Sequence, residues 1–136
     1  MALHSFSLAK TCGIIGYGAF FWGLGVLSIR HCGTCMFQTN LSRSLTMTAI
    51  VPAAYTVIRL TEAVFSLNVQ DTLAAVALGI GAASILDGIA YTWFPSAYEC
   101  PELQKKDPLA ACTISRYGSG SSLFFVGAAL TMLVFM

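Results

Sequence analysis

One long apolar segment, residues 72–94, most restricts the folds that this chain can adopt. It reads TLAAVALGIGAASILDGIAYTWF, is rich in small residues and contains a single carboxylate, Asp87. A transmembrane helix needs about 20 predominantly apolar residues, so this segment is long enough to cross a bilayer. Three further apolar segments, at about residues 11–29, 44–67 and 117–136, have a similar character. The sequence therefore predicts four membrane spans.

The composition supports the same class of protein. The chain has 136 residues, of which 57% are hydrophobic and 10% charged, and its mean hydropathy is +0.76. A soluble domain usually has about a quarter charged residues, so this chain cannot cover itself with a water-facing shell. We predict an all-α fold, a single four-helix transmembrane bundle over residues 1–136. The net charge of +1 and the lack of a basic run exclude nucleic acid as an expected partner.

The predicted connections fix the topology of the bundle. The link at about residues 68–71 is very short, so we expect the second and third spans to form an antiparallel hairpin. The polar stretches 30–43 and 95–116 are expected to be loops on one side of the membrane, with both termini opposite. That side has more positive charges, namely Arg30, Arg43, Lys105, Lys106 and Arg116, against Lys10 on the other. The positive-inside rule then places both loops in the cytoplasm, matrix or stroma.

Three charged residues fall within the predicted spans. Arg59 and Glu62 are three residues apart, so they occupy adjacent positions on one helical face. A charge near mid-membrane costs a few kcal/mol, so such residues normally face the protein interior and find partners there. Asp87 differs from Arg59 in depth by roughly 10 Å, a gap that a long arginine side chain can partly close, while Glu62 competes for the same arginine. We expect an intramembrane network of Arg59, Glu62 and Asp87 that fixes helix register, binds a proton or cation, or contacts a partner subunit or a lipid headgroup.

Four cysteines lie in the two predicted loops on the same side. Cys32 and Cys35 form a C-x-x-C pair in the first loop, and Cys100 and Cys112 lie in the second. Two such pairs are a common structural zinc arrangement. The layout also resembles that of quinone-linked membrane oxidases that form disulfides, although the charge bias places these loops on a reducing side. Ordinary, structural thiols are the third interpretation.

Short motifs around the first and third spans suggest a family. An Arg and a Gly follow the first span, an Asp lies in the third, and a Phe-Pro pair and another aromatic follow it, at Arg30, Gly33, Asp87, Phe94, Pro95 and Tyr98. In these features the chain resembles an uncharacterised family of small four-span membrane proteins known mainly from bacteria. The resemblance implies the four-helix architecture and no established activity. It also implies that Asp87 and Phe94-Pro95 belong to the common pattern of the fold.

The sequence contains no nucleotide loop, catalytic triad, metal-ligand helix or nucleophile elbow, so we do not expect an enzyme, a cofactor or a metal ion. We expect a non-catalytic accessory subunit of a larger membrane complex, respiratory or photosynthetic, in a mitochondrial inner membrane or a plastid membrane. Its partners would be other membrane-protein subunits and bound lipids. No Arg-rich, Ser-rich transit peptide precedes the first span, so an organellar location requires internal signals or synthesis within the organelle. The alternatives are a small transporter or ion-handling protein centred on Asp87, and a membrane thiol oxidoreductase that uses the four cysteines.

Overall fold

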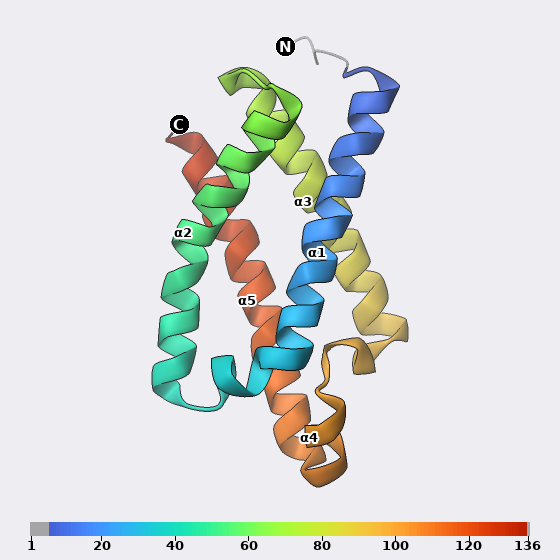
Figure 1. Cartoon of the computed structure of the whole chain (residues 1–136), viewed down its shortest axis with the longest axis vertical. Helices are drawn as coiled ribbons and strands as arrows, with labels where there is room; N and C mark the ends of the chain where they lie inside the picture. Colours follow the sequence, from blue (N-terminus) through green and yellow to red (C-terminus); the bar gives the residue numbers. More distant parts are fainter. Residues whose placement is uncertain (1–5, 136) are drawn as a thin grey trace.

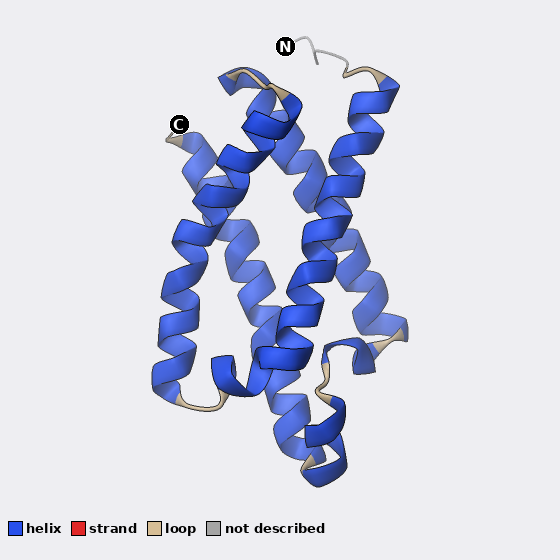
Figure 2. Ribbon diagram, viewed as in Figure 1, coloured by secondary structure: helices blue, strands red, loops and turns tan. Residues whose placement is uncertain are grey.

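The chain forms four long helices and two short ones in the computed structural model, which describes residues 6–135 apart from the side chain of Pro95 (Figure 1). The long helices are α1 (Leu8–Phe37), α2 (Asn40–Phe65), α3 (Val69–Trp93) and α5 (Pro108–Val134), and the 3-10 helix η1 (Pro95–Tyr98) and α4 (Pro101–Lys106) connect α3 to α5. Within the described range no strand is present (Figure 2). Each long helix is long and apolar enough to cross a membrane. The predicted all-α, four-helix transmembrane fold is therefore confirmed. Residues 1–5 and Met136, which belong to the predicted domain and its fourth span, lie outside the described range.

Side-chain caps set the starts of all four long helices, beginning with Ser7, whose hydroxyl accepts from the Lys10 backbone N–H at the start of α1. Thr39 and Ser42 form a reciprocal capping box at the start of α2, and the Asn68 side chain accepts from the Asp71 backbone N–H at the start of α3. Asp107 accepts from the Ala110 backbone N–H, and Pro108 occupies the first turn of α5, where its missing N–H costs nothing. These caps lie outside the apolar segments. The helices therefore extend beyond the predicted spans, and part of the predicted loop 95–116 is helical.

The predicted first loop, residues 30–43, is wrong. The α1 helix continues to Phe37, and only Gln38 and Thr39 separate it from α2. The polar residues in this stretch do not end the helix because its inner side is packed: Phe37 is 1% exposed, and Gly33 is buried against Ile114 of α5. His31 and the two nearby cysteines are exposed on the other side of the same turns.

Glycine sets how closely α1 approaches its neighbours. A Cβ atom added at Gly18 would clash with the carbonyl oxygen of Gly79 on α3 and lie 2.8 Å from its Cα atom, so backbone meets backbone at this crossing. On the α5 side, Ile29 fills the space beside Gly118, where an added Cβ atom would lie 2.6 Å from the Ile29 Cγ2 atom. Lipid gives helices no hydrophobic reason to associate, so van der Waals contact of this kind holds the bundle together.

A cluster of buried apolar residues lies between α2, α3 and α5 and consists of Ala54, Ile58, Val76 and Ala129. The α2–α3 connection is short, as predicted, and it begins with Ser66 in the left-handed conformation at φ 47°. The two helices meet at this turn and then separate, because α3 packs mainly on α1 and α2 mainly on α5 (Figure 1). The start of α1 and the end of α5 lie at one end of the bundle, and α4 lies at the other.

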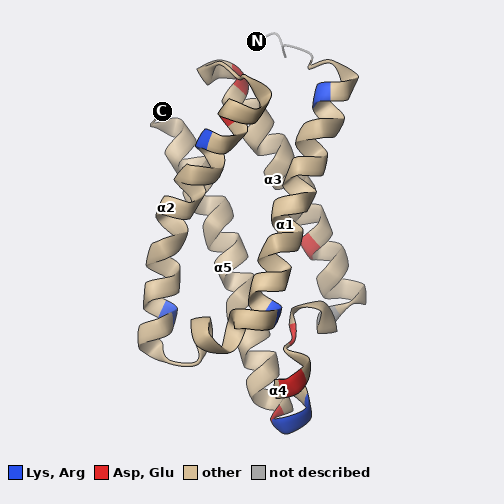
Figure 3. Ribbon diagram, in the orientation of Figure 1, with Lys and Arg blue, Asp and Glu red and all other residues tan. Residues whose placement is uncertain are grey.

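Most of the charged residues lie toward the two ends of the bundle, and the acid on α3 is the clearest exception (Figure 3). That acid is Asp87, the single charged residue of α3 beyond its first turn. The bundle is thus apolar along most of its length, with a polar site at this carboxylate.

Candidate functional site

The candidate site is centred on Asp87, six residues before the end of α3. Its Oδ1 atom accepts a hydrogen bond from the Trp22 indole N–H of α1 at 2.6 Å and another from the Tyr98 hydroxyl of η1. The Trp22 Nε1 atom also lies 3.2 Å from the Tyr98 hydroxyl oxygen. Three side chains from three elements therefore share one hydrogen-bonded cluster inside the bundle, which we call the Asp87 cluster (Trp22, Asp87 and Tyr98).

The turn after α3 brings Tyr98 into this cluster. Phe94 ends α3, and the Ala97 N–H then donates to the Phe94 carbonyl at 2.9 Å, which turns the chain back toward α1. Tyr98 is 1% exposed and belongs to the buried core formed with Ile29, Phe37, Ala90 and Ile114. Burial, and the hydrogen bond to Asp87, raise the pKa of the Tyr98 phenol well above its ordinary value of 10.0. Tyr98 is therefore a neutral hydrogen-bond donor at physiological pH.

Tyr91 connects the cluster to α5. Its ring stacks on that of Tyr98 with the centroids 4.7 Å apart and the planes 17° from parallel. Its hydroxyl donates to the Ser115 carbonyl of α5 at 3.2 Å. This bond crosses from α3 to α5 beside a region where the two helices separate.

A cleft of about 360 Å³ opens between α3 and α5 next to the cluster. Asp87 forms part of its wall, and it has no hydrogen bond to Oδ2 from any residue in the described part of the chain. Among the same residues no side-chain oxygen or nitrogen is both buried and without a partner, so the free Oδ2 atom is accessible. The arrangement leaves one carboxylate oxygen available to a proton, a cation or a donor from another molecule. The cleft is lined by Ser84, Asp87, Gly88, Tyr91, Ser119, Leu123 and Val126.

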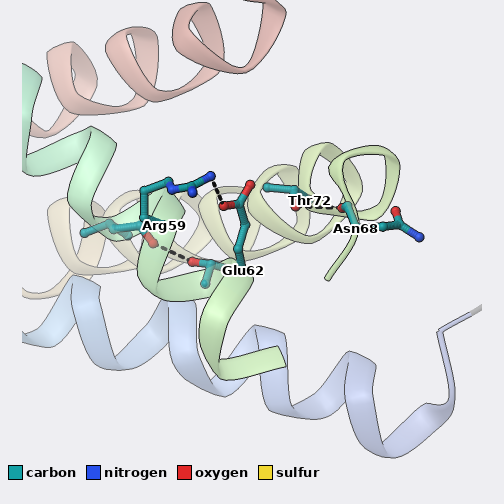
Figure 4. Close-up of polar contacts among 6 residues, drawn as sticks. Arg59, Glu62, Asn68 and Thr72 are labelled. Atoms are coloured by element: carbon teal, nitrogen blue, oxygen red, sulfur yellow. Dashed lines mark hydrogen bonds and ion pairs between the residues drawn. The ribbon is translucent and has the colours of Figure 1, made fainter. Parts of the chain in front are cut away.

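Arg59 and Glu62 form a separate pair, and the expected three-residue network is not formed. The Arg59 Nη1 atom lies 2.6 Å from the Glu62 Oε2 atom, near the C-terminal end of α2 and the α2–α3 turn (Figure 4). Arg59 is 57% exposed, so the prediction that it faces the protein interior is also wrong. The reason is its position: Arg59 lies less than two turns from the end of α2, where a long side chain can reach the interface.

The Asn68 carbonyl accepts from the Thr72 hydroxyl at 2.8 Å close to this pair, so the turn has its own polar contacts (Figure 4).

The Arg59–Asp87 bridge that the spacing allowed is not formed, because Arg59 bonds to Glu62 instead. Asp87 has different partners, Trp22 and Tyr98, which the sequence analysis did not identify. One signal was present: an indole N–H in the middle of a membrane span needs an acceptor, and a nearby carboxylate can supply it.

The cysteines do not form a site. Cys32 and Cys35 are exposed on the last turns of α1, Cys100 caps α4, and Cys112 is exposed on α5; these and Cys12 are all free thiols. Across residues 6–135 no three His, Cys, Asp or Glu side chains are grouped so that they could hold a metal ion. Neither the zinc interpretation nor the disulfide-shuttle interpretation gains support from this geometry.

No known protein family, curated protein or solved structure matches this chain. The resemblance to the family of small four-span proteins stays a prediction. The fold and composition themselves define the class: an integral membrane protein built from four transmembrane helices, with one polar cluster at Asp87.

Proposed function

We propose that the chain is a non-catalytic accessory subunit of a larger membrane complex, and that another transmembrane helix packs on the uncovered face of α3. The observation that carries this proposal is a row of small, exposed residues on that face. A Cβ atom added at Gly81 or at Gly88 would have no neighbour within 4 Å. The row consists of Ala77, Gly81, Ser84, Gly88 and Thr92, which recur at helical spacing.

Small residues favour association between helices in lipid, because they let two backbones approach closely. The chain itself uses this device where Gly18 meets Gly79. The row on α3 offers the same kind of surface and has no partner helix of this chain over its open part. A second helix seated there would also lie beside the free oxygen of Asp87.

We further propose that the complex belongs to an energy-converting organellar membrane, mitochondrial or plastid. The end of the bundle that contains α4 would face the matrix or stroma, because more lysine and arginine residues lie there.

Native size in mild detergent tests the proposal. The wild-type chain should migrate in a complex much larger than its own 14.5 kDa. Gly88→Leu should release it from that complex, and Gly25→Leu, on an equally open position of α1, is the matched control. Migration of the wild-type chain at its own size would contradict an accessory role.

A second function, binding of a proton or small cation at Asp87, is favoured by the accessible Oδ2 atom in the cleft. No lysine or arginine in the described part of the chain forms an ion pair with this carboxylate. Asp87→Asn keeps an oxygen that can accept from Trp22 and Tyr98 but removes the charge. If wild-type protein in liposomes conducts protons or cations and Asp87→Asn does not, with its assembly intact, the ion-handling function is the correct one.

A further inference from the structure

A second cavity lies on α5, at the end of the bundle that contains α4. It has a volume of about 400 Å³ and is lined by Thr113, Arg116 and Tyr117, which are three and four residues apart and therefore share one side of the helix. Arg116 is exposed and forms no ion pair with a carboxylate of residues 6–135. Its guanidinium is thus a cation that has no carboxylate partner among the described residues and lies beside an open cavity.

A second guanidinium packs on Tyr117, one of the residues that line this cavity. Arg43, in the first turn of α2, places its Cζ atom 4.4 Å from the ring centroid of Tyr117. Its Nε atom donates to the Thr39 carbonyl at 3.3 Å, which leaves the two terminal nitrogens of the fork free for a ligand. The stacked ring and this hydrogen bond together orient Arg43, so less side-chain freedom is lost when it binds.

The cavity lies in the N-terminal half of α5, toward one end of a membrane-spanning helix, where a span approaches the headgroup region. Arg43 begins a membrane-spanning helix, and Tyr117 is an aromatic residue of the kind that marks a membrane–water boundary. Further positive residues are located at the same end, on the last turns of α1 and on α4, namely Arg30, Lys105 and Lys106. Basic pockets between transmembrane helices at such a level suit anionic head groups.

We propose that Arg116 and Arg43 bind the phosphate group of an anionic phospholipid in this cavity. Two guanidinium forks match the geometry of phosphate oxygens, and hydrogen bonds between ionised partners are about twice as strong as neutral ones. The Thr113 hydroxyl donates to the Leu109 carbonyl at 2.8 Å, so Thr113 shapes the wall and the arginines recognise the phosphate. This site is distinct from Asp87 and does not depend on the accessory role.

The test compares lipids on the purified full-length chain. Binding of dioleoylphosphatidylglycerol is measured by native mass spectrometry and by the rise in thermal stability on lipid addition, with dioleoylphosphatidylcholine as the zwitterionic comparison. We expect Arg116→Gln to weaken phosphatidylglycerol binding about 10-fold or more, with Arg43→Gln close behind, because each removes a charge-assisted contact. Lys106→Gln, which removes the same charge from the exposed α4, is the matched control and should change binding less than about 3-fold.

Each outcome decides the matter. An equal loss in the Lys106→Gln variant, or no loss in either arginine variant, overturns the site. Equal protection by inorganic phosphate overturns the lipid as its source, because a free anion would then suffice. Arg116→Lys should keep part of the affinity, since lysine retains the charge without the bidentate fork. If Arg116→Gln does not fold, Arg43→Gln and Arg116→Lys keep the comparison complete.

Discussion

The two sides of α3 make opposite use of small residues. Toward α1, Gly18 meets Gly79 so closely that a Cβ atom at Gly18 would clash with the Gly79 backbone, whereas a Cβ atom at Gly79 would make ordinary contacts, the nearest 3.7 Å from the Ile14 carbonyl oxygen. Toward α5 and the open side, Gly81 and Gly88 have free space around them, and a cleft separates the helices. The same residue type thus closes one interface and leaves the other open.

On the two sides of α3, the close contact forms where the facing helix presents a surface of little bulk. Gly18 supplies such a surface to Gly79, whereas Leu123 and Val126 of α5 stand across the cleft from Gly88. The gap stays open, and Ser84, Asp87 and Ser119 are the polar residues of its wall.

The largest effect should come from closing the space at the α1–α3 crossing. Gly18→Ala adds a Cβ atom that clashes with the Gly79 backbone, which has no flexible end that can move aside. We expect the free energy of unfolding to fall by about 1–3 kcal/mol, the usual cost of overpacking. Gly16→Ala on the same helix has open space and should be neutral or slightly stabilising. Thermal unfolding in detergent measures both, and similar values would show that the crossing is not tightly packed.

Removal of the Tyr98 hydroxyl should lower the free energy of unfolding by a similar amount, because it weakens the Asp87 cluster. Tyr98→Phe keeps the buried ring but deletes a donor to Asp87, and hydrogen bonds to charged groups contribute about 1.5–3 kcal/mol. Tyr55→Phe, at a residue that is 50% exposed, is the matched control and should change stability little. Chemical unfolding curves of the two variants give the comparison. A loss of unfolding free energy no greater than that of Tyr55→Phe would contradict a structural role for the cluster.

Alkaline pH should destabilise the protein partly through the same tyrosine. The pKa of Tyr98 is higher in the folded chain than in the unfolded chain, where it is about 10, so the folded state holds this proton more tightly. The contribution is complete below about pH 10 and is lost as the pH rises further. Melting temperatures measured from pH 8 upward should fall more steeply in the wild-type protein than in Tyr98→Phe. Parallel curves would contradict the assignment.

The smallest effect is a gain at the α2–α3 turn. Ser66 adopts a left-handed conformation at φ 47°, which costs an L-residue roughly 1–2 kcal/mol relative to glycine. Ser66→Gly should therefore raise the free energy of unfolding by up to about 1 kcal/mol, since part of the gain is offset by the freedom of glycine in the unfolded chain. Differential scanning calorimetry detects a change of this size. A decrease would mean that the serine side chain stabilises the turn.

The sequence was sufficient for the fold class because apolar length and low charge depend only on local composition. It did not suffice to predict the residues at which the helices begin and end. The polar residues around His31 predicted a loop, but burial of Gly33 and Phe37 against other helices keeps that stretch helical, and such burial depends on the whole fold. Caps such as Asp107-Pro108 were visible in the sequence, but the hydropathy pattern outweighed them in setting the predicted start of the last helix.

The site was predicted in part. Asp87 was identified from its depth in an apolar segment, and the possible bond between Arg59 and Glu62 from their spacing, which the structure bears out. The true partners of Asp87 could not be obtained from spacing along α2 and α3. They come from α1 and from a turn that folds back after Phe94, and the sequence does not reveal that direction.

The Asp87 cluster also has a consequence for how the chain is made. Trp22 enters the bilayer with α1, well before Asp87, whereas Tyr98 is synthesised eleven residues after the carboxylate it contacts. During translation, the third helix therefore reaches the membrane when Trp22 has already been inserted and Tyr98 is still inside the ribosome. An aspartate at the centre of an inserting helix costs about 2.5–3.5 kcal/mol on translocon scales, and Asp87, six residues from the end of α3, should cost less than that. The early tryptophan offsets part of that cost, so α3 should insert more efficiently when α1 precedes it than when it is presented alone.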